Sequence, residues 1–357
     1  MTGSMSEDVR APLPTRRQAF ALAGLGATAA GALAACSSSS SGGGSSGAGV
    51  GDFPKTPNWN FVFVNHVTTN PFFQPTQYAI QDACKIFGCR YQWTGSETSG
   101  VSQMVNAMNA AISAKADGIA VALVDTSAFN DPTKKAMDAG IPVVSYNADA
   151  AGNGRLAYIG QDLYQSGVQM GQRIVSLVPS GKVALFIATP GSLNIQPRID
   201  GAMTAIKQSG KPIQATAIAT GADLNGELSR IDSYYQGNKD VKGMFAVDAG
   251  STQGVAQTMQ KYGLQAKGMH GGGYDLLPTT LKLIKTGDLD FTIDQEAYLQ
   301  GFLPVTLLYL YKLSGTLLGP PETNTGLKFV TKDNVAPYLS TQNRYEGSSA
   351  QQKYLTS

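Results

Sequence analysis

Short apolar runs, separated by polar loops and amphipathic segments, recur along the chain from residue 58 to residue 300. The runs lie at 61–64, 119–124, 141–146, 183–188, 213–219, 244–247 and 291–294, with a further short strand expected at 267–270. They consist mostly of Val, Ile, Leu, Phe and Ala, without strict alternation with polar residues in most runs. This pattern is typical of strands in a parallel sheet that is covered on both faces.

Segments with helical spacing lie between these runs. In 101–115 the apolar positions fall on one helix face: Val101, Met104, Val105, Met108 and Ile112. The methionines of this face are therefore predicted to be core residues rather than ligands of a bound group. Glycines follow the last turn of four predicted helices: Gly88, Gly140, Gly210 and Gly263. Alternating strands and helices predict a doubly wound α/β fold.

The alternation is interrupted at AYIGQDLYQSG, residues 157–167, and a second, comparable set of strands and helices follows. The two sets predict two similar α/β lobes, each of ordinary domain size. Ligands of open α/β sheets bind beyond the carboxyl ends of the strands, so the space between the two lobes is the expected binding site.

The N-terminal segment 15–36, TRRQAFALAGLGATAAGALAAC, has the pattern of an export signal and is left out of the predicted fold. It is too rich in glycine and too weakly hydrophobic for a stable membrane span. Arg16 and Arg17 favour the twin-arginine export route, whereas Phe20 stands one position late for that motif and leaves the general secretory route open.

The signal ends in Leu-Ala-Ala-Cys, which looks like a bacterial lipobox with Cys36 as the lipidated first residue of the mature protein. The Ser- and Gly-rich stretch 37–51 predicts a flexible tether. We therefore expect an exported protein whose soluble body is held by a lipid at the outer face of the cytoplasmic membrane.

Charge and cysteine content narrow the function further. The net charge is +2, with basic and acidic residues interspersed, so the sequence does not favour nucleic acid or anionic lipid as a partner.

After Cys36 only Cys84 and Cys89 remain. Export permits a disulfide between them, which we favour over two buried free thiols. The chain lacks the second cysteine pair or nearby histidines of a structural zinc site. Neither a metal nor a cofactor is expected.

Aromatic and polar residues follow the predicted strands in a consistent way. The candidate site residues are His66, Asn70, Phe72, Phe73, Asn147, Asn194, Gln196, Arg198, Asp248, Asp275 and Gln295. Aromatic rings cover the C–H faces of a polyhydroxylated molecule, and amides, carboxylates and arginine pair with its hydroxyl groups. At least one ring of Phe72-Phe73 is expected in the site, while the other could pack in the core. Arg198 could instead tie its helix to a neighbouring loop.

Four segments in this order resemble the ribose-type sugar-binding proteins, which are related to the lac repressor and serve as soluble receptors of bacterial ABC importers. The segments are TNPFF (69–73), FAVD (245–248), GGGYD (271–275) and FTIDQ (291–295). The resemblance spans residues 58 to about 330. It implies that Asn70, Phe72 and Phe73 hold the sugar together with Asp248, Asp275 and Gln295. It also implies an ABC permease as partner and a monomeric receptor without a cofactor.

The resemblance further implies three crossings between the lobes, near residues 162, 296 and 324. The expected division is a signal peptide (1–35), lipidated Cys and tether (36–55), N-terminal lobe (56–162 plus 297–323), C-terminal lobe (163–296 plus 324–345) and tail (346–357). Closure of such lobes about their hinge traps the ligand. Asn147 and Gln196 stand where the ribose receptors have charged residues. A different neutral ligand is therefore implied, either a monosaccharide or a sugar alcohol.

An enzyme is the alternative, either carbohydrate-active or ester-hydrolysing and secreted. The segment HGGG (270–273) is similar to the oxyanion-hole segment of esterases. However, the serine of GSTQG (250–254) comes one position early for a nucleophile elbow, and His270 is the last histidine. Asp248 and Asp275 could form a glycosidase pair, but no second feature supports one. The sequence therefore favours a binding protein over an enzyme.

Overall fold

The computed structural model describes residues 54–340 of the chain. The predicted export signal, the lipidation site Cys36, most of the tether and the tail 346–357 lie outside the described residues.

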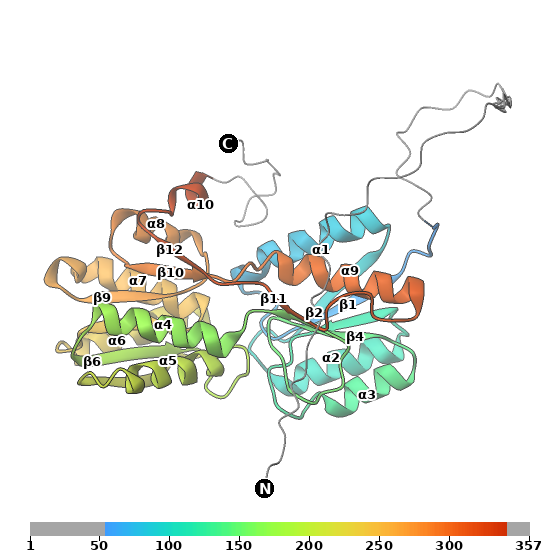
Figure 1. Cartoon of the computed structure of the whole chain (residues 1–357), viewed down its shortest axis with the longest axis horizontal. Coiled ribbons are helices and arrows are strands. Elements are labelled where there is room, and N and C mark those ends of the chain that lie inside the picture. Colours follow the sequence, from blue (N-terminus) through green and yellow to red (C-terminus); the bar gives the residue numbers. More distant parts are fainter. Residues whose placement is uncertain (1–53, 341–357) are drawn as a thin grey trace, which may run out of the picture. The chain divides into compact units, whose positions relative to one another are not determined.

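A first six-stranded sheet has the order β11-β5-β4-β3-β1-β2, and all neighbouring strands are parallel. Its strands are β1 (Asn60–Asn65), β2 (Arg90–Gly95), β3 (Gly118–Val121), β4 (Val143–Tyr146), β5 (Tyr158–Gly160) and β11 (Glu322–Asn324). The associated helices are η1 (Pro71–Phe73), α1 (Gln74–Phe87), α2 (Val101–Ser113), α3 (Asn130–Asp138) and α9 (Leu299–Ser314). Figure 1 shows α1 and α9 on one side of this sheet and α2 and α3 on the other. We call this body lobe 1.

A second six-stranded sheet repeats the order as β12-β10-β9-β8-β6-β7, and only β12 is antiparallel to its neighbour. Its strands are β6 (Gly181–Ile187), β7 (Ile213–Ala219), β8 (Gly243–Ala246), β9 (His270–Tyr274), β10 (Phe291–Asp294) and β12 (Lys328–Thr331). Its helices are α4 (Leu163–Leu177), α5 (Gln196–Gln208), α6 (Leu224–Gly237), α7 (Ala249–Tyr262), η2 (Gln265–Lys267), α8 (Pro278–Thr286) and α10 (Ala336–Ser340). We call this body lobe 2.

Strand β6 shows why these strands are continuously apolar. Val183 and Leu185 face the core that α4 and α5 complete, whereas Ala184 and Phe186 face the core of α6, α7 and α8. Because successive side chains of a strand point to opposite faces, a sheet with helices on both faces needs apolar residues at every position. The predicted doubly wound, two-lobe α/β fold is therefore confirmed.

Three segments connect the lobes. The chain leaves the first sheet after β5 and enters α4, returns between β10 and α9, and leaves again between β11 and β12. Helix α4 packs on α5 within lobe 2, and α9 packs on α1 within lobe 1. Each lobe is thus built from separate stretches of the chain.

The strand expected at 267–270 is wrong in its position. Residues 265–267 form η2, and the glycine-rich segment itself, His270–Tyr274, is β9. A side chain at Gly272 would meet the ring of Phe291 at 2.5 Å, and one at Gly273 would meet Thr252 Oγ1 at 2.2 Å. The glycines are therefore required by close packing within lobe 2. Strands β2, β5, β11 and β12 are additions to the predicted set.

The favoured disulfide is a second correction. Cys84, in α1, and Cys89, just beyond its end, are both buried and both free. Contact with the Cys89 thiol, together with burial, raises the pKa of the Cys84 thiol above its usual value. Gly88 adopts φ 69° as the cap of α1, so it does turn the chain, but the turn leaves two thiols rather than a bridge.

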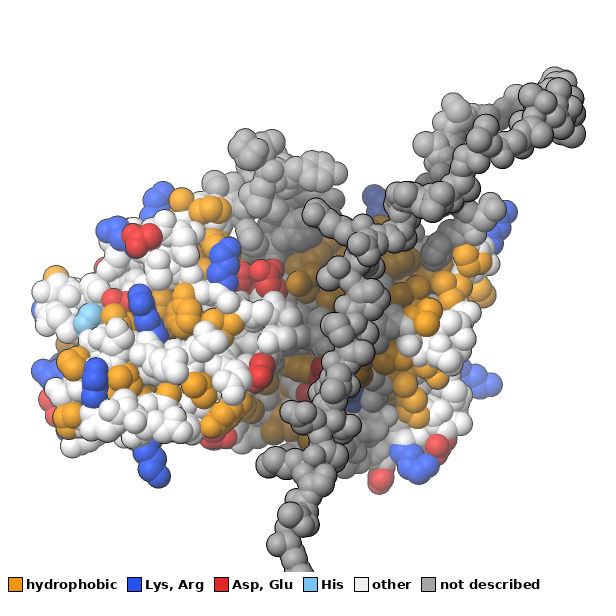
Figure 2. Space-filling model, in the orientation of Figure 1, with side chains coloured by type: hydrophobic (Ala, Val, Ile, Leu, Met, Phe, Trp, Pro, Cys, Tyr) orange, Lys and Arg blue, Asp and Glu red, His pale blue; other side chains and the backbone are white. Residues whose placement is uncertain are grey.

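Within residues 54–340 none of the helices combines the length and the apolar character needed to cross a membrane. On the face shown in Figure 2, basic and acidic side chains are interspersed rather than gathered into one large patch.

Candidate functional site

A cavity lies at the carboxyl ends of strands from both sheets. Its volume is about 310 Å³, part of it open to solvent, and it is lined by ten of the eleven predicted residues together with Ile195 and Ala249. The ten are His66, Asn70, Phe72, Phe73, Asn147, Asn194, Arg198, Asp248, Asp275 and Gln295. We call this cavity the main compartment.

Gln196 is the predicted residue that does not line it. Its Oε1 accepts from the backbone N–H of Gly191 at 2.9 Å, and its Nε2 donates to Asp200 Oδ1 at 2.8 Å. Gln196 begins α5, and residues two positions apart in a helix point in different directions. Arg198 therefore points inward while Gln196 ties down the preceding loop.

The Asn-Pro-Phe-Phe turn builds one wall. Asn70 caps η1 because its Oδ1 accepts from the backbone N–H of Phe72 at 2.9 Å. Phe73 is 1% exposed and packs against Trp93 in the core, while Phe72 packs edge-on against Phe73 with ring centroids 4.7 Å apart. Both rings line the main compartment, and Phe73 is also a core residue.

His66 is held in one tautomer by its neighbours. Ser192 Oγ donates to Asn194 Oδ1 at 2.6 Å, so the Asn194 amide turns its Nδ2 toward His66 Nε2, 3.0 Å away. Burial lowers the pKa of His66 to about 4, so the ring is neutral at physiological pH. A neutral ring that accepts at Nε2 carries its proton on Nδ1. The buried Nδ1 has no hydrogen-bond partner among the described residues.

Four side chains form a continuous line of amide hydrogen bonds. Asn147 Nδ2 donates to Gln300 Oε1 at 3.0 Å, Gln300 Nε2 donates to Gln295 Oε1 at 3.1 Å, and Gln295 Nε2 donates to Asp275 Oδ1 at 2.6 Å. Because every donor points the same way, the orientation of each amide is fixed. Asn147 Oδ1 is left buried without a partner among the described residues.

The two ends of this amide line have unusual backbones. Asn147 has φ 64° and Asp275 has φ 77°, the left-handed region that Asn and Asp tolerate better than most residues. Burial raises the pKa of Asp275 to about 7, although Arg198 and the bond from Gln295 oppose that change. The carboxyl group therefore titrates close to neutral pH.

Arg198 is 2% exposed and lies over the ring of Tyr274, 4.0 Å from its centroid. It donates to Val247 O at 2.8 Å and to Gln161 Oε1 at 3.1 Å, and its Nε has no partner among the described residues. The structure thus combines the two roles considered for Arg198. It ties α5 to the segment after β8, and it also lines the cavity.

Asp248 begins α7 as its N-cap. Its Oδ1 accepts from the backbone N–H of Ser251 at 2.8 Å, and its Oδ2 accepts from that of Ala188 at 2.9 Å. The prediction did not include its neighbour Glu227, on α6. Burial and the charge of Asp248 raise the pKa of Glu227 to about 10, so this carboxyl group is neutral at physiological pH.

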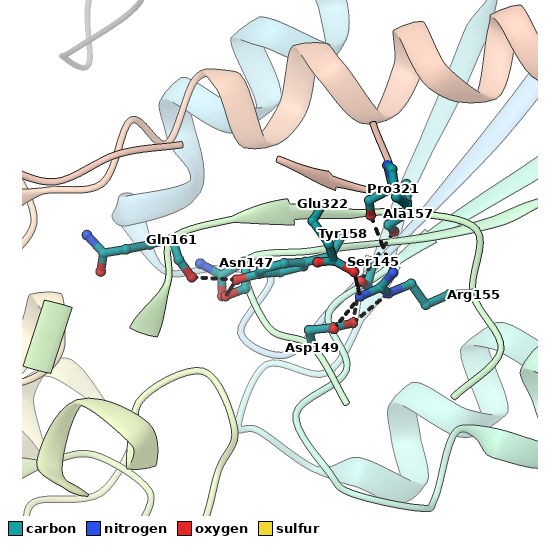
Figure 3. A network of polar contacts seen from close by, with 9 residues as sticks. All are labelled: Ser145, Asn147, Asp149, Arg155, Ala157, Tyr158, Gln161, Pro321 and Glu322. Atoms are coloured by element: carbon teal, nitrogen blue, oxygen red, sulfur yellow. Dashed lines mark hydrogen bonds and ion pairs between the residues drawn. The ribbon is translucent and has the colours of Figure 1, made fainter. Parts of the chain in front are cut away.

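A polar network supports the segment around Asn147 (Figure 3). Arg155 donates to both oxygens of Asp149, at 2.9 and 2.5 Å, and to Glu322 of β11 at 2.7 Å. Tyr158 donates through its hydroxyl to Gln161 O at 3.0 Å. The loop that carries Asn147 is therefore linked to β5 and β11 at the edge of the sheet.

Gln300, Gln161 and Glu227 are the polar residues that the sequence did not indicate. Gln300 and Gln161 are 0% and 1% exposed. Gln300 lies within α9, and Gln161 directly follows β5, a strand that the sequence pattern did not predict. Gln300 bonds to Asn147 and Gln161 bonds to Arg198, and because these partners are distant in sequence no local pattern reveals them. Gly250 gives the one indirect signal for Glu227, because a side chain there would meet its carboxyl group at 2.5 Å.

The donors and acceptors of the site match hydroxyl groups. His66 and Arg198 offer N–H groups, whereas Asn147, Asp248 and Asp275 offer oxygens, and a hydroxyl group can donate and accept at once. Among residues 54–340, no group of three or more His, Cys, Asp and Glu side chains is arranged to hold a metal ion.

Comparison with known proteins gives a consistent result. Residues 61–316 match the family model of the periplasmic binding protein domain. The chain is 54% identical over 318 residues to the xylose/arabinose-binding protein XylF of Sulfolobus acidocaldarius, covering 85% of this chain and 78% of that protein. It is 27% identical over 242 residues to the D-galactose/methyl-galactoside binding periplasmic protein MglB of Haemophilus influenzae, covering 62% of this chain and 70% of that one.

Two solved structures show the same fold. An ABC transporter solute-binding protein from Burkholderia graminis, in complex with D-arabinose, superposes with a TM-score of 0.74 at 26% identity and covers 80% of this chain and 99% of its own. A carbohydrate transporter protein from Acidothermus cellulolyticus, in complex with myo-inositol, gives a TM-score of 0.70 at 24% identity, with coverages of 79% and 97%.

Proposed function

Because the chain belongs to the periplasmic binding protein family, we propose that it is an extracytoplasmic receptor that captures a neutral sugar and presents it to an ABC permease. The sugar is a monosaccharide, and the relatives that bind xylose or arabinose favour an aldopentose as the first candidate. A sugar alcohol is the second candidate, because the same side chains pair with hydroxyl groups on an open chain.

The observation that carries this proposal is a set of buried polar atoms without partners. His66 Nδ1, Asn147 Oδ1 and Arg198 Nε are such atoms within the described residues, and all three residues line the main compartment. An unpaired buried polar atom costs about 1–3 kcal/mol, so folded proteins rarely keep several in one place without a partner to supply. Hydroxyl groups of a bound sugar supply both the donors and the acceptors that these atoms need.

Capture uses both lobes. Phe72, Phe73 and Asn147 come from lobe 1, whereas Arg198, Asp248 and Asp275 come from lobe 2. A ligand that contacts both lobes favours the arrangement in which they are close together. The three connecting segments, near residues 162, 296 and 324, are the proposed hinge. The protein acts as a monomer, anchored through Cys36 outside the cytoplasmic membrane, and does not change its ligand chemically.

The first test is calorimetric titration and thermal denaturation of the full chain with D-xylose, L- and D-arabinose, D-ribose, D-glucose, D-galactose and myo-inositol. Binding to the folded state raises the melting temperature, by an amount that grows with ligand concentration. We expect a rise with at least one of these ligands, loss of the rise in His66→Ala and Asp275→Ala, and recovery of the ligand unchanged.

The matched control is Gln196→Ala, which alters a neighbouring polar residue that does not line the main compartment. This variant should bind like the parent protein. The proposal fails if none of the sugars or polyols binds, or if the bound sugar is converted to a product.

A further inference from the structure

A second cavity adjoins the main compartment. It shares five lining residues with the main compartment, namely His66, Asn70, Asn194, Ile195 and Asp248. We call it the side compartment. The main and side compartments have similar volumes, about 310 and 330 Å³ with part of each open to solvent, so a group of the size that one receives also fits the other.

The remaining walls of the side compartment are uncharged or hydroxylated, apart from one carboxyl group. They are formed by Val67, Ser99, Ala188, Thr189, Ala222 and Glu227. Lysine and arginine are absent from this lining, so the compartment does not suit a phosphate or a carboxylate substituent. Small apolar side chains beside hydroxyl groups suit a neutral group that has both C–H faces and hydroxyl groups.

Glu227 is fixed at the wall of this compartment. It is 2% exposed, and its Oε2 accepts from Ser251 Oγ at 2.8 Å. Gly250 leaves the space that this carboxyl group fills, because a side chain there would meet it at 2.5 Å. Burial, followed by the negative charge of Asp248 and a hydrogen bond with that carboxylate, raises the pKa of Glu227 to about 10. Glu227 is therefore a neutral acid that shares its proton with Asp248, and the two carboxyl groups lie together at the wall of the side compartment.

The opposite wall is held next to His66. The backbone N–H of Ser99 donates to His66 O at 2.9 Å, which places the loop before α2 against the shared wall. Lobe 1 thus contributes Val67 and Ser99, and lobe 2 contributes Thr189, Ala222 and Glu227. A group that enters the side compartment contacts both lobes, as the ring in the main compartment does.

Building on the proposed function, we infer that the side compartment receives an uncharged, hydroxylated substituent of the ring bound in the main compartment. The protein then binds neutral glycosides, such as a disaccharide of two pentoses, in addition to the free monosaccharide. The small side chain of Ala222 and the carboxyl group of Glu227 determine whether the substituent is accepted.

The test compares the full chain with Ala222→Phe by calorimetric titration. The probes are D-xylose, methyl β-D-xyloside and xylobiose, with L-arabinose and the corresponding arabinose compounds as a second series. We expect the parent protein to bind a glycoside within about tenfold of its monosaccharide. Ala222→Phe fills the side compartment and should weaken glycoside binding about a hundredfold, while the monosaccharide changes by less than about threefold.

Ala217→Phe is the matched control, since Ala217 is exposed on β7 and lines neither compartment. It should leave all affinities unchanged. Glu227→Gln keeps a donor and should retain glycoside binding, whereas Glu227→Leu should lose it.

Two results would overturn the inference. One is binding of the monosaccharide without binding of any glycoside, which leaves the receptor function standing. The other is an equal loss of monosaccharide and glycoside in Ala222→Phe. Failure of every probe, monosaccharides included, would instead contradict the proposed function itself.

Discussion

Individual buried side chains in this protein are arranged to leave specific atoms available. His66 accepts a hydrogen bond from Asn194 at Nε2, which leaves its Nδ1 proton available. Asn147 donates through Nδ2 to Gln300, which leaves its Oδ1 available. In each case the protein bond fixes the orientation of the group, and the remaining atom is the one that a ligand can pair with. Discrimination among sugars then follows from which hydroxyl groups meet these atoms.

Asp275 gives a prediction at this scale. Its pKa is about 7 in the ligand-free protein, and a ligand hydroxyl that donates to its oxygen favours the ionised form. Affinity should therefore rise with pH up to about 7 and then level off, with binding about tenfold or more weaker at pH 5.5 than at pH 7.5. Calorimetric titrations across this range measure the effect.

The Asp275→Asn variant is the control for this pH dependence and should give a flat profile. His66, with a pKa of about 4, and Glu227, with a pKa of about 10, keep one protonation state over this range. The ligand-free fold should show the opposite trend. Because the pKa of Asp275 is raised on folding, its contribution to stability is lost as pH rises from about 4 to 7. A parent profile that is flat for binding would contradict the assignment.

Residues of the site divide into those that the sequence can reveal and those that it cannot. Gln295 directly follows β10 and Asp248 follows β8 after one residue, so the strand pattern alone places both at the carboxyl edge of the sheet. Gln300 and Glu227 lie within helices and act through partners that only the fold brings near. Gln196 does not line the main compartment, because direction around a helix, rather than proximity in sequence, decides which side chain enters the cavity.

At the scale of elements, the close packing of α4 on α5 positions Arg198. A side chain at Gly167 would meet Arg198 O at 2.3 Å, and one at Gly201 would meet Tyr164 O at 2.2 Å. The two helices approach so closely because both present glycine at the contact. Arg198 is therefore fixed through its backbone as well as through its guanidinium group.

Gly167→Ala should push the two helices apart. We expect it to lower the free energy of unfolding by about 1–3 kcal/mol and to weaken sugar binding, because Arg198 moves with α5. Urea denaturation and calorimetric titration measure the two effects. The matched control is Gly237→Ala at the exposed end of α6, where an added side chain meets nothing within 4 Å. That variant should be as stable as the parent or more so, by about 0.5–1 kcal/mol. Equal behaviour of the two variants would contradict the packing argument.

At the scale of elements, the sequence placed one strand wrongly, beside the glycine-rich segment Gly271–Gly273. The predicted strand, 267–270, ends before Gly271–Gly273, whereas these glycines, packed against Phe291 and Thr252, belong to strand β9. Strand β2, with the sequence RYQWTG, has a partly exposed pattern rather than the continuous apolar run of the central strands. Sequence patterns of this kind identify buried central strands more readily than edge strands.

For the whole molecule, the sequence was sufficient to predict the two-lobe architecture because both sheets repeat one strand order and bury both faces. The amide line from Asn147 to Asp275 joins the lobes through Gln300, and this link depends on the assembled fold. Thr325 adds to it, since its hydroxyl donates to Gln295 O at 2.8 Å.

Gln300→Leu should break the link between the lobes. Asn147 Nδ2 and Gln295 Oε1 would lose their partners, at a cost of about 1–3 kcal/mol for each buried group. We expect a lower melting temperature and weaker sugar binding, although Gln300 does not line the main compartment. The control is Thr306→Ala on the same helix, whose hydroxyl bonds only to Phe302 O, at 2.9 Å. Unchanged affinity in Gln300→Leu would show that the amide line does not position the site.

Helix α9 packs on α1, and its Val305, Leu308 and Tyr309 are buried in the core of lobe 1, although α9 follows the strands β6–β10 of lobe 2 in the chain. A ribosome therefore delivers β1–β5 long before the helix that covers one of their faces. During that interval lobe 2 can acquire most of its core, while lobe 1 keeps an apolar surface uncovered. The order of synthesis thus leaves the first lobe incomplete until most of lobe 2 has been made, and chaperones or an export machinery that act on incompletely packed chains would encounter it in that state.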